Sequence, residues 1–191
     1  MSKAQAQFVI SITSRDRVGI VYEISKAISE LNGNIADVRQ SVLCGYFTMI
    51  LLASFPAKVT ERSIERKLAE VDAHSETAIQ AMVKRMDSSE LPGPVSAPEN
   101  VYVLTASGKD KIGFVATVAL FCVHHQINIL DLSTTVADGA YIMILMVDLS
   151  QCESISAVRK DLQVFGQQAG LTVVLQHYDI FKAVNEINLP A

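Results

Sequence analysis

A chain of 191 residues is long enough for one large domain or two small ones, each with its own buried core. Hydrophobic residues make up 50% of the chain, but no apolar run approaches the roughly 20 residues that cross a bilayer, so a membrane protein is not expected. The formal net charge is -4, with 20 acidic against 16 basic residues and no basic block, which argues against direct binding to a nucleic acid backbone.

The first residues carry no apolar stretch of the kind found in secretory signals. The three cysteines, Cys44, Cys122 and Cys152, are an odd number at wide spacings, which fits neither a disulfide framework nor a zinc cluster. We therefore expect a cytoplasmic protein with reduced thiols and with no bound metal or cofactor.

The sequence repeats itself, because residues 8–55 align without a gap with residues 102–149. Identical pairs fall at glycine, asparagine and aspartate positions, among them Gly19 and Gly113, Asn34 and Asn128, Gly45 and Gly139, and Asp37 and Asp131. Such matches at a fixed distance predict two copies of one structural unit.

A segment rich in proline, glycine and serine separates the two copies and cannot continue a helix or a central strand. This predicts a first domain over residues 1–87, a linker over residues 88–99 and a second domain over residues 100–191.

The first predicted strands cover residues 8–13 and 101–106. The loops after them contain Asp16 and Asp110, which we expect to cap the following helices at their N-termini. Apolar residues then recur at helical spacing and predict one buried face on each helix. The residues expected on this buried face are Val18, Val21, Ile24, Ile28 and Leu31 in the first copy, and Ile112, Val115, Val118 and Cys122 in the second.

The next strands are predicted over residues 34–43 and 128–137, and over 47–55 and 141–149. The short breaks between them, Cys44-Gly45 and Asp138-Gly139, indicate hairpins. A second amphipathic helix follows in each copy, marked by Ile64, Leu68 and Val71, and by Ile155, Val158, Leu162 and Phe165. In the second copy it is expected to end near Gly170.

The last strands are predicted over residues 77–86 and 171–180. Each copy therefore has the order βαββαβ, and the fold class is α+β. We predict two tandem ferredoxin-like domains, each an antiparallel four-stranded sheet with its helices on one face.

The third strand of each copy is apolar at consecutive positions, from Met49 to Ala53 and from Ile142 to Val147. A sheet buried on one side would show alternation. We therefore expect the open face of the sheet to be at least partly covered, most simply by a second chain, which predicts a homodimer.

The loop Asp16-Arg17-Val18-Gly19-Ile20, with Asn34-Ile35 after the first helix, resembles the ACT domain, a small-molecule regulatory module. The segment Asp110 to Phe114, with Asn128-Ile129, repeats the pattern, so the resemblance covers nearly the whole chain. A tandem pair of this size is similar to the glycine cleavage system transcriptional repressor family. Where the family often has proline in the loop, this chain has Val18 and Ile112. The second copy has Ile127 in place of Gly33, which favours the first copy as a ligand site.

The resemblance implies that an amino acid binds between the first loop of one module and the start of the second strand of its neighbour. The candidate ligand-binding residues in the first copy are Asp16, Arg17, Val18, Gly19, Ile20, Asn34 and Ile35. Those in the second copy are Asp110, Lys111, Ile112, Gly113, Phe114, Asn128 and Ile129. Free N–H groups at a helix start suit the ligand's carboxylate, and an asparagine amide oxygen suits its ammonium.

Each of these residues also has a purely structural interpretation. Asp16 and Asp110 could only cap helices, Gly19 and Gly113 could only allow close packing, and the asparagines could only serve turns.

The sequence contains no motif of the common hydrolases, phosphate-binding loops or metalloproteases, so we expect no enzyme activity. Formyltetrahydrofolate deformylases resemble the first copy, but a second module stands where their catalytic domain would follow. An acylphosphatase-like or RNA-binding module of the same fold class is a weaker alternative, and a ligand-independent scaffold is another. We expect an amino-acid-responsive regulator that modulates a partner protein, one form of which is indirect transcriptional repression of glycine metabolism.

Overall fold

The structure is a computed structural model that describes residues 5–73, 79–86 and 100–185. The chain divides into two compact units, residues 1–93 and 94–191. The linker expected at residues 88–99 lies outside the described residues, and the exact domain bounds stay a prediction.

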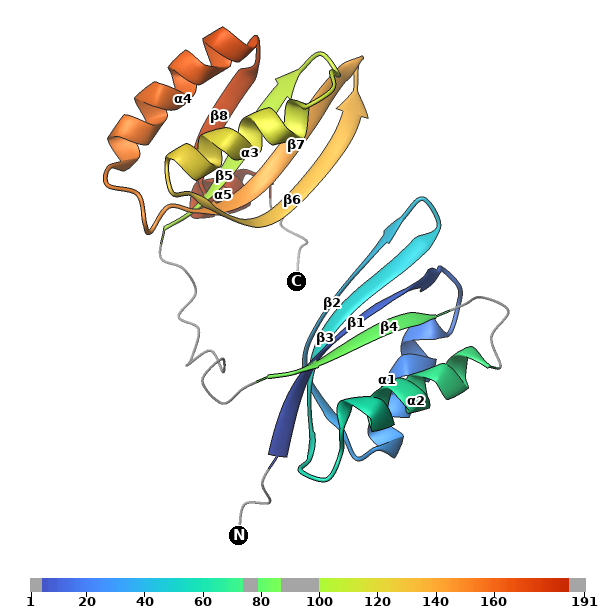
Figure 1. The fold of residues 1–191 in the computed structure, drawn as a ribbon. Helices are drawn as coiled ribbons and strands as arrows, with labels where there is room; N and C mark the ends of the chain where they lie inside the picture. Colours follow the sequence, from blue (N-terminus) through green and yellow to red (C-terminus); the bar gives the residue numbers. More distant parts are fainter. Residues whose placement is uncertain (1–4, 74–78, 87–99, 186–191) are drawn as a thin grey trace. The chain divides into compact units, whose positions relative to one another are not determined.

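Both units have the same order of six elements, which confirms the predicted fold class (Figure 1). Unit one consists of β1 (Gln5–Arg15), α1 (Ile20–Glu30), β2 (Asn34–Leu43), β3 (Tyr46–Pro56), α2 (Glu61–Asp72) and β4 (Gln80–Arg85). Unit two consists of β5 (Val101–Gly108), α3 (Phe114–His124), β6 (Asn128–Ala137), β7 (Ala140–Asp148), α4 (Ile155–Ala169) and β8 (Thr172–His177), followed by α5 (Tyr178–Asn185).

Each unit contains one antiparallel four-stranded sheet, in the order β2-β3-β1-β4 and β6-β7-β5-β8. The two helices of each βαββαβ unit lie on one face of its sheet (Figure 1). The core lies between them and is built from alternate strand residues such as Phe8, Ile10 and Leu51, which are at most 2% exposed. The first strand is central, so the loop that follows it emerges from the middle of the sheet.

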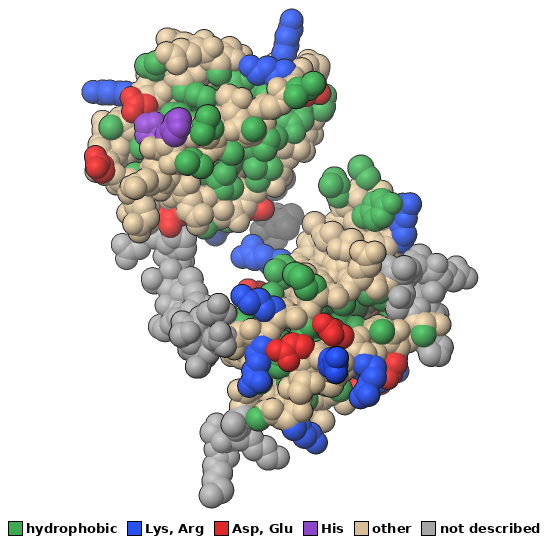
Figure 2. Space-filling view, in the orientation of Figure 1, with side chains coloured by type: hydrophobic (Ala, Val, Ile, Leu, Met, Phe, Trp, Pro, Cys, Tyr) green, Lys and Arg blue, Asp and Glu red, His purple; other side chains and the backbone are tan. Residues whose placement is uncertain are grey.

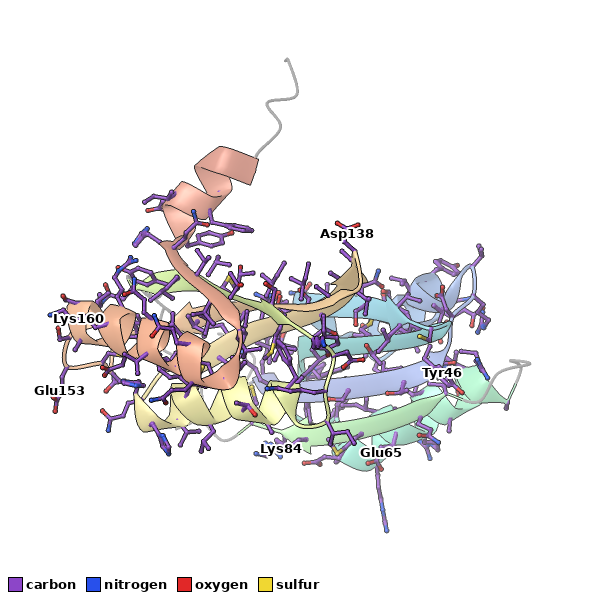
Figure 3. The ribbon with its side chains drawn as sticks, turned by 90° about the horizontal axis from the view of Figure 1, so that it is seen from above. Tyr46, Glu65, Lys84, Asp138, Glu153 and Lys160 are labelled. Carbon is purple, nitrogen blue, oxygen red and sulfur yellow. The ribbon has the colours of Figure 1, made fainter. Side chains whose placement is uncertain are left out.

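Two-residue turns join the central hairpins, as the sequence predicts. Cys44 and Gly45 have φ of 50° and 77°, and Asp138 and Gly139 have φ of 52° and 75°. Positive φ at both central residues is the type I′ arrangement, whose twist matches that of the strands. Figure 3 shows Asp138 at the tip of the β6–β7 hairpin.

The predicted N-caps at Asp16 and Asp110 are wrong. The helices begin at Ile20 and Phe114, and their N-cap residues are Gly19 and Gly113, with φ of 93° and 84°. A cap must stand directly before the first helical residue to reach the first-turn N–H groups, and both aspartates lie three residues too early.

The predicted buried faces of the first helices need the same correction at their N-terminal ends. Val18 and Ile112 precede the helices and are fully exposed, at 101% and 106%. Val21 and Val115 are also exposed. The buried residues of these helices are Ile20, Ile24, Ala27 and Ile28 in α1, and Phe114, Val118, Phe121 and Cys122 in α3.

An additional helix, α5, begins at Tyr178, where the sequence predicts that the last strand continues to residue 180. It lies against β5 and β8. Val103 faces away from α3 and α4, as the alternation along β5 shows, and yet it is only 4% exposed. The chain's own helix thus covers part of the open face of the second sheet. Cover by a second chain stays a prediction.

Candidate functional site

The loops that follow the first strands connect the middle of each sheet to the start of a helix. In unit one the loop runs between Arg15 and Ile20, and in unit two between Gly108 and Phe114. The left-handed conformation of Gly19 and Gly113 turns the chain into the helix, and residues with a Cβ atom rarely adopt it. The nearest atom that a Cβ on Gly19 would meet is Glu23 Oε1, at 3.8 Å, so the surface above the loop is open.

The helices differ in how their N-termini are satisfied. The side chains of Thr60 and Ser154 cap α2 and α4 by accepting from Ser63 N and Ala157 N. Neither α1 nor α3 has a side-chain cap among the residues that the structure describes. Because the first-turn N–H groups of a helix need acceptors and carry its positive pole, these two helix starts are suited to an anionic ligand group.

Arg17 and Glu23 form a two-pronged ion pair beside the α1 N-terminus. Arg17 Nη1 donates to Glu23 Oε1 at 3.0 Å, and Nη2 donates to Oε2. This hydrogen bonding lowers the pKa of Glu23 and raises the pKa of Arg17. The arginine therefore neutralises a carboxylate that would otherwise repel an incoming anion.

Unit two replaces this pair with Lys111 and Thr117. Lys111 Nζ donates to Ala169 O at 3.0 Å, at the C-terminal end of α4, where a cation complements the helix dipole. Thr117 Oγ1 donates to Gly113 O at 2.9 Å. The first turn of α3 contains no acidic residue, so its N-terminus has no competing carboxylate of its own.

Asn34 and Asn128 lie at the other end of their sheets from these loops. Asn34 pairs with Ser54, which also pairs with Gln7, whereas the loop leaves β1 after Arg15. Eight residues of strand separate the two rows, about 26 Å. Within one unit the structure therefore does not bring the loop and the asparagine together.

Four of the candidate residues have side chains that belong to the core. Ile20 and Phe114 are 2% exposed, and Ile35 and Ile129 are partly buried against the two hydrophobic clusters. Ile20 and Phe114 therefore offer a ligand only their backbone, and Ile35 and Ile129 offer their backbone and part of a side chain. Asp16, Val18, Asp110 and Ile112 are exposed, and Asp16 N donates to Gly45 O at 3.0 Å, which fixes the loop on the β2–β3 turn.

The difference between Gly33 and Ile127 is a core packing exchange. A Cβ on Gly33 would lie 2.4 Å from Phe55 Cε1 and 2.8 Å from Ile28 Cγ2. The corresponding residues of unit two are the smaller Leu149 and Cys122, and Ile127 is itself buried. Core packing therefore accounts for the difference between Gly33 and Ile127. This difference gives no reason to favour the first copy as the ligand site.

A model of the ACT domain matches residues 6–83 and 100–176. The chain belongs to the ACT domain family. Domains of this family are regulatory ligand-binding modules, and both matches contain the uncapped helix start.

Several related proteins match a stretch about as long as one copy. A UPF0237 protein of Methanopyrus kandleri is 35% identical over 86 residues, which are 44% of this chain and 96% of the relative. A UPF0237 protein of Methanocaldococcus jannaschii has the same identity and coverage.

Two solved structures match nearly the whole tandem ACT chain. A protein of unknown function from Galdieria sulphuraria has a TM-score of 0.72 at 25% identity, covering 91% of this chain and 99% of its own. A candidate glycine cleavage system transcriptional repressor has a TM-score of 0.71 at 18% identity, covering 90% and 96%, which shows a shared fold. In the part of the ACT protein that the structure describes, no helix is long and apolar enough to cross a membrane.

Proposed function

We propose that this ACT protein is a non-enzymatic, cytoplasmic regulator that binds an amino acid and changes the activity of a partner protein, indirect repression of transcription being one form. The observation that carries the proposal is the pair of helix starts that lack a side-chain cap, at Gly19 and Gly113. The other two helices of the βαββαβ units have such caps, so the missing ones coincide with the loops of the ACT motif.

The chemistry of these loops suits an α-amino acid. The backbone N–H groups and the helix dipole attract the ligand's carboxylate without a cationic side chain. The ligand's ammonium group needs an acceptor, and the exposed amides of Asn34 and Asn128 provide one. Asn34 is about 26 Å from the loop of its own unit, and Asn128, seven strand residues from its own loop, is about 23 Å from it. A complete site therefore takes the loop from one unit and the asparagine from the other.

The asparagines stand at exposed edges of their sheets. β2 and β6 each form one edge and are exposed over nearly their whole length. Asn34 and Asn128 stand at the start of these strands, so both amides are reachable from outside their own sheet. With each asparagine contributed by the opposite copy, Asn34 completes the proposed site at Gly113 and Asn128 the proposed site at Gly19.

Apolar side chains lie exposed beside these edges. Figure 2 shows hydrophobic side chains gathered over α3 and the neighbouring strand β6. Exposed examples are Val123 at 70%, Val136 at 65% and Leu132 at 39%. On the equivalent side of unit one, Val38 and Val42 are 48% and 50% exposed. Exposed apolar surface of this kind is typical of binding surfaces.

Isothermal titration of the full chain with single amino acids, glycine and serine first, tests the proposal. We expect saturable binding to two sites. Gly19→Val and Gly113→Val each force a β-branched residue into positive φ and should each remove one site. Thermal unfolding without ligand serves as the control for folding.

Double variants test whether the sites cross between units. Gly19→Val with Asn128→Ala damages the same predicted site twice and should leave one site intact. Gly19→Val with Asn34→Ala damages both sites and should abolish binding. The reverse pattern would show that each site combines the loop and the asparagine of the same copy, which would require copies from two chains, because the strand register keeps these residues apart within one unit.

If no amino acid produces heat or thermal stabilisation, the second candidate is a ligand-independent scaffold. The observation that favours it is α3, whose eleven residues include no Asp, Glu, Lys or Arg and leave Leu120 and Val123 exposed at 54% and 70%. An apolar exposed helix face of this kind is typical of protein contacts.

A further inference from the structure

The open face of the first sheet, which faces away from α1 and α2, carries a self-complementary arrangement of side chains. Strand pairing places its residues in rows that run across the sheet. Two adjacent rows consist of Lys84, Val9, Leu52 and Asp37, and of Met82, Ser11, Ile50 and Arg39. Figure 3 labels Lys84 on β4, at one end of the first row. The middle of the first row is apolar, and the second row has Ser11 beside Ile50. At the β2 edge the first row ends in an acid and the second in a base.

The middle of this face is incompletely buried. Ile50 is 49% exposed and Met82 is 67% exposed. Val9, Leu52 and Ile50 line a shallow depression whose rim includes Asp37 and Arg39. Asp37 Oδ1 also accepts a hydrogen bond from Val38 N at 2.8 Å, at the irregularity in the β2 register. An apolar depression with an acid and a base side by side at its β2 edge is suited to a partner surface whose charges stand in the reverse order.

We propose that the open faces of the first sheet of two chains pack against each other in a homodimer. A two-fold axis that passes between the two rows, perpendicular to the strands, exchanges one row with the other. Asp37 then faces Arg39 of the partner subunit, and Leu52 faces Ile50 of the partner subunit. Sheets packed face to face are about 10 Å apart, a distance that side chains of this size fill.

Unit two lacks this arrangement. At the position equivalent to Arg39 it has Ser133, so Asp131 would find no opposite charge across the same axis. The open face of the second sheet also carries α5, which lies against β5 and β8. The homodimer contact is therefore assigned to unit one.

Charge exchange between two chains tests the contact. In sedimentation and light-scattering measurements the full chain should have twice its 20.8 kDa mass. Arg39→Asp and Asp37→Arg each place like charges opposite one another and should weaken the dimer at least tenfold. Mixed in equal amounts, the two variants have opposite charges at both contacts, so they should form a heterodimer. Ser133→Asp, at the equivalent position of unit two, is the matched control and should leave the dimer unchanged.

The inference rests on the proposed homodimer and not on ligand binding. A monomeric wild-type chain would overturn both the homodimer and this contact. A dimer that tolerates both single variants, or a mixture that stays monomeric, would overturn the contact and leave the homodimer standing. Circular dichroism shows whether each variant is folded, and Arg39→Asp leaves the Asp37 hydrogen bond intact. A titration without heat would refute the amino-acid site and leave this inference unaffected.

Discussion

The side chains around Gly33 leave no room for a Cβ atom, so replacing this glycine should lower the free energy of unfolding. In Gly33→Ala the new Cβ meets the Phe55 ring and Ile28, and overpacking of a core costs about 1–3 kcal/mol. Urea unfolding should show this loss. Adding Phe55→Leu, the residue type of unit two, should recover part of it, because the closest contact disappears. A double variant whose loss equals the sum of the two single losses would show that Gly33 is not held by this contact.

The buried thiol of Cys122 makes the stability of the protein depend on pH. Its side chain is 1% exposed, and burial raises the pKa of the thiol from 9.0 to about 11. A folded pKa above the unfolded value gives a stabilisation that is complete below pH 9 and is lost as the pH rises to 11. Unfolding free energies at pH 8.5 and 10.5 should therefore decline more steeply for the wild type than for Cys122→Ala, by less than about 1.4 kcal/mol per pH unit. Equal declines in the unfolding free energies of the two proteins would contradict a raised pKa for Cys122.

At the scale of elements, α5 explains why the open face of the second sheet is partly buried. A chain that ends at His177 exposes Val103, and exposure of one buried aliphatic side chain costs about 1.5–3 kcal/mol. We expect thermal unfolding at a lower temperature and faster amide exchange in β5 and β8. A chain that ends at Asn185 separates the effect of α5 from that of the residues that follow. Unchanged exchange in β5 would show that the helix contributes no cover.

The elements that the sequence predicted are those with a repeated pattern. Two aligned copies identify the first three strands of each unit and the hairpin glycines, because turns with positive φ restrict the residue type. The C-terminal cap at Gly170 was predicted from the residue type alone. α5 lies outside the aligned residues 102–149, so the repeat could not reveal it. The helix starts were misplaced because aspartate is a common cap, and only the backbone shows that a glycine takes that position.

The sequence identifies which loop and strand positions belong to the candidate site, but not how these positions lie relative to one another in the fold. Gly19 and Asn34 follow from the family pattern, but the strand register shows that they lie at opposite ends of one sheet. The pairing of Arg17 with Glu23 follows no helical spacing, since the arginine stands in the loop. The sequence shows that residues 114–117 carry no charge. Only the structure shows that α3 begins at Phe114, so that these residues form its first turn.

At the scale of the whole molecule, the proposed site requires that the two units exchange residues. This predicts proximity between Asn34 and the loop of unit two, and distance from the loop of its own unit. A short bis-maleimide should cross-link Asn34→Cys to Ile112→Cys in high yield and should fail with Asn34→Cys and Val18→Cys, which lie in one unit about 26 Å apart along the strands. Both variants carry Cys44→Ser, because the native thiol is exposed. Addition of the ligand should increase the yield of the first pair, since binding favours the arrangement that completes the site. Equal yields from the two pairs would refute a site built from both units.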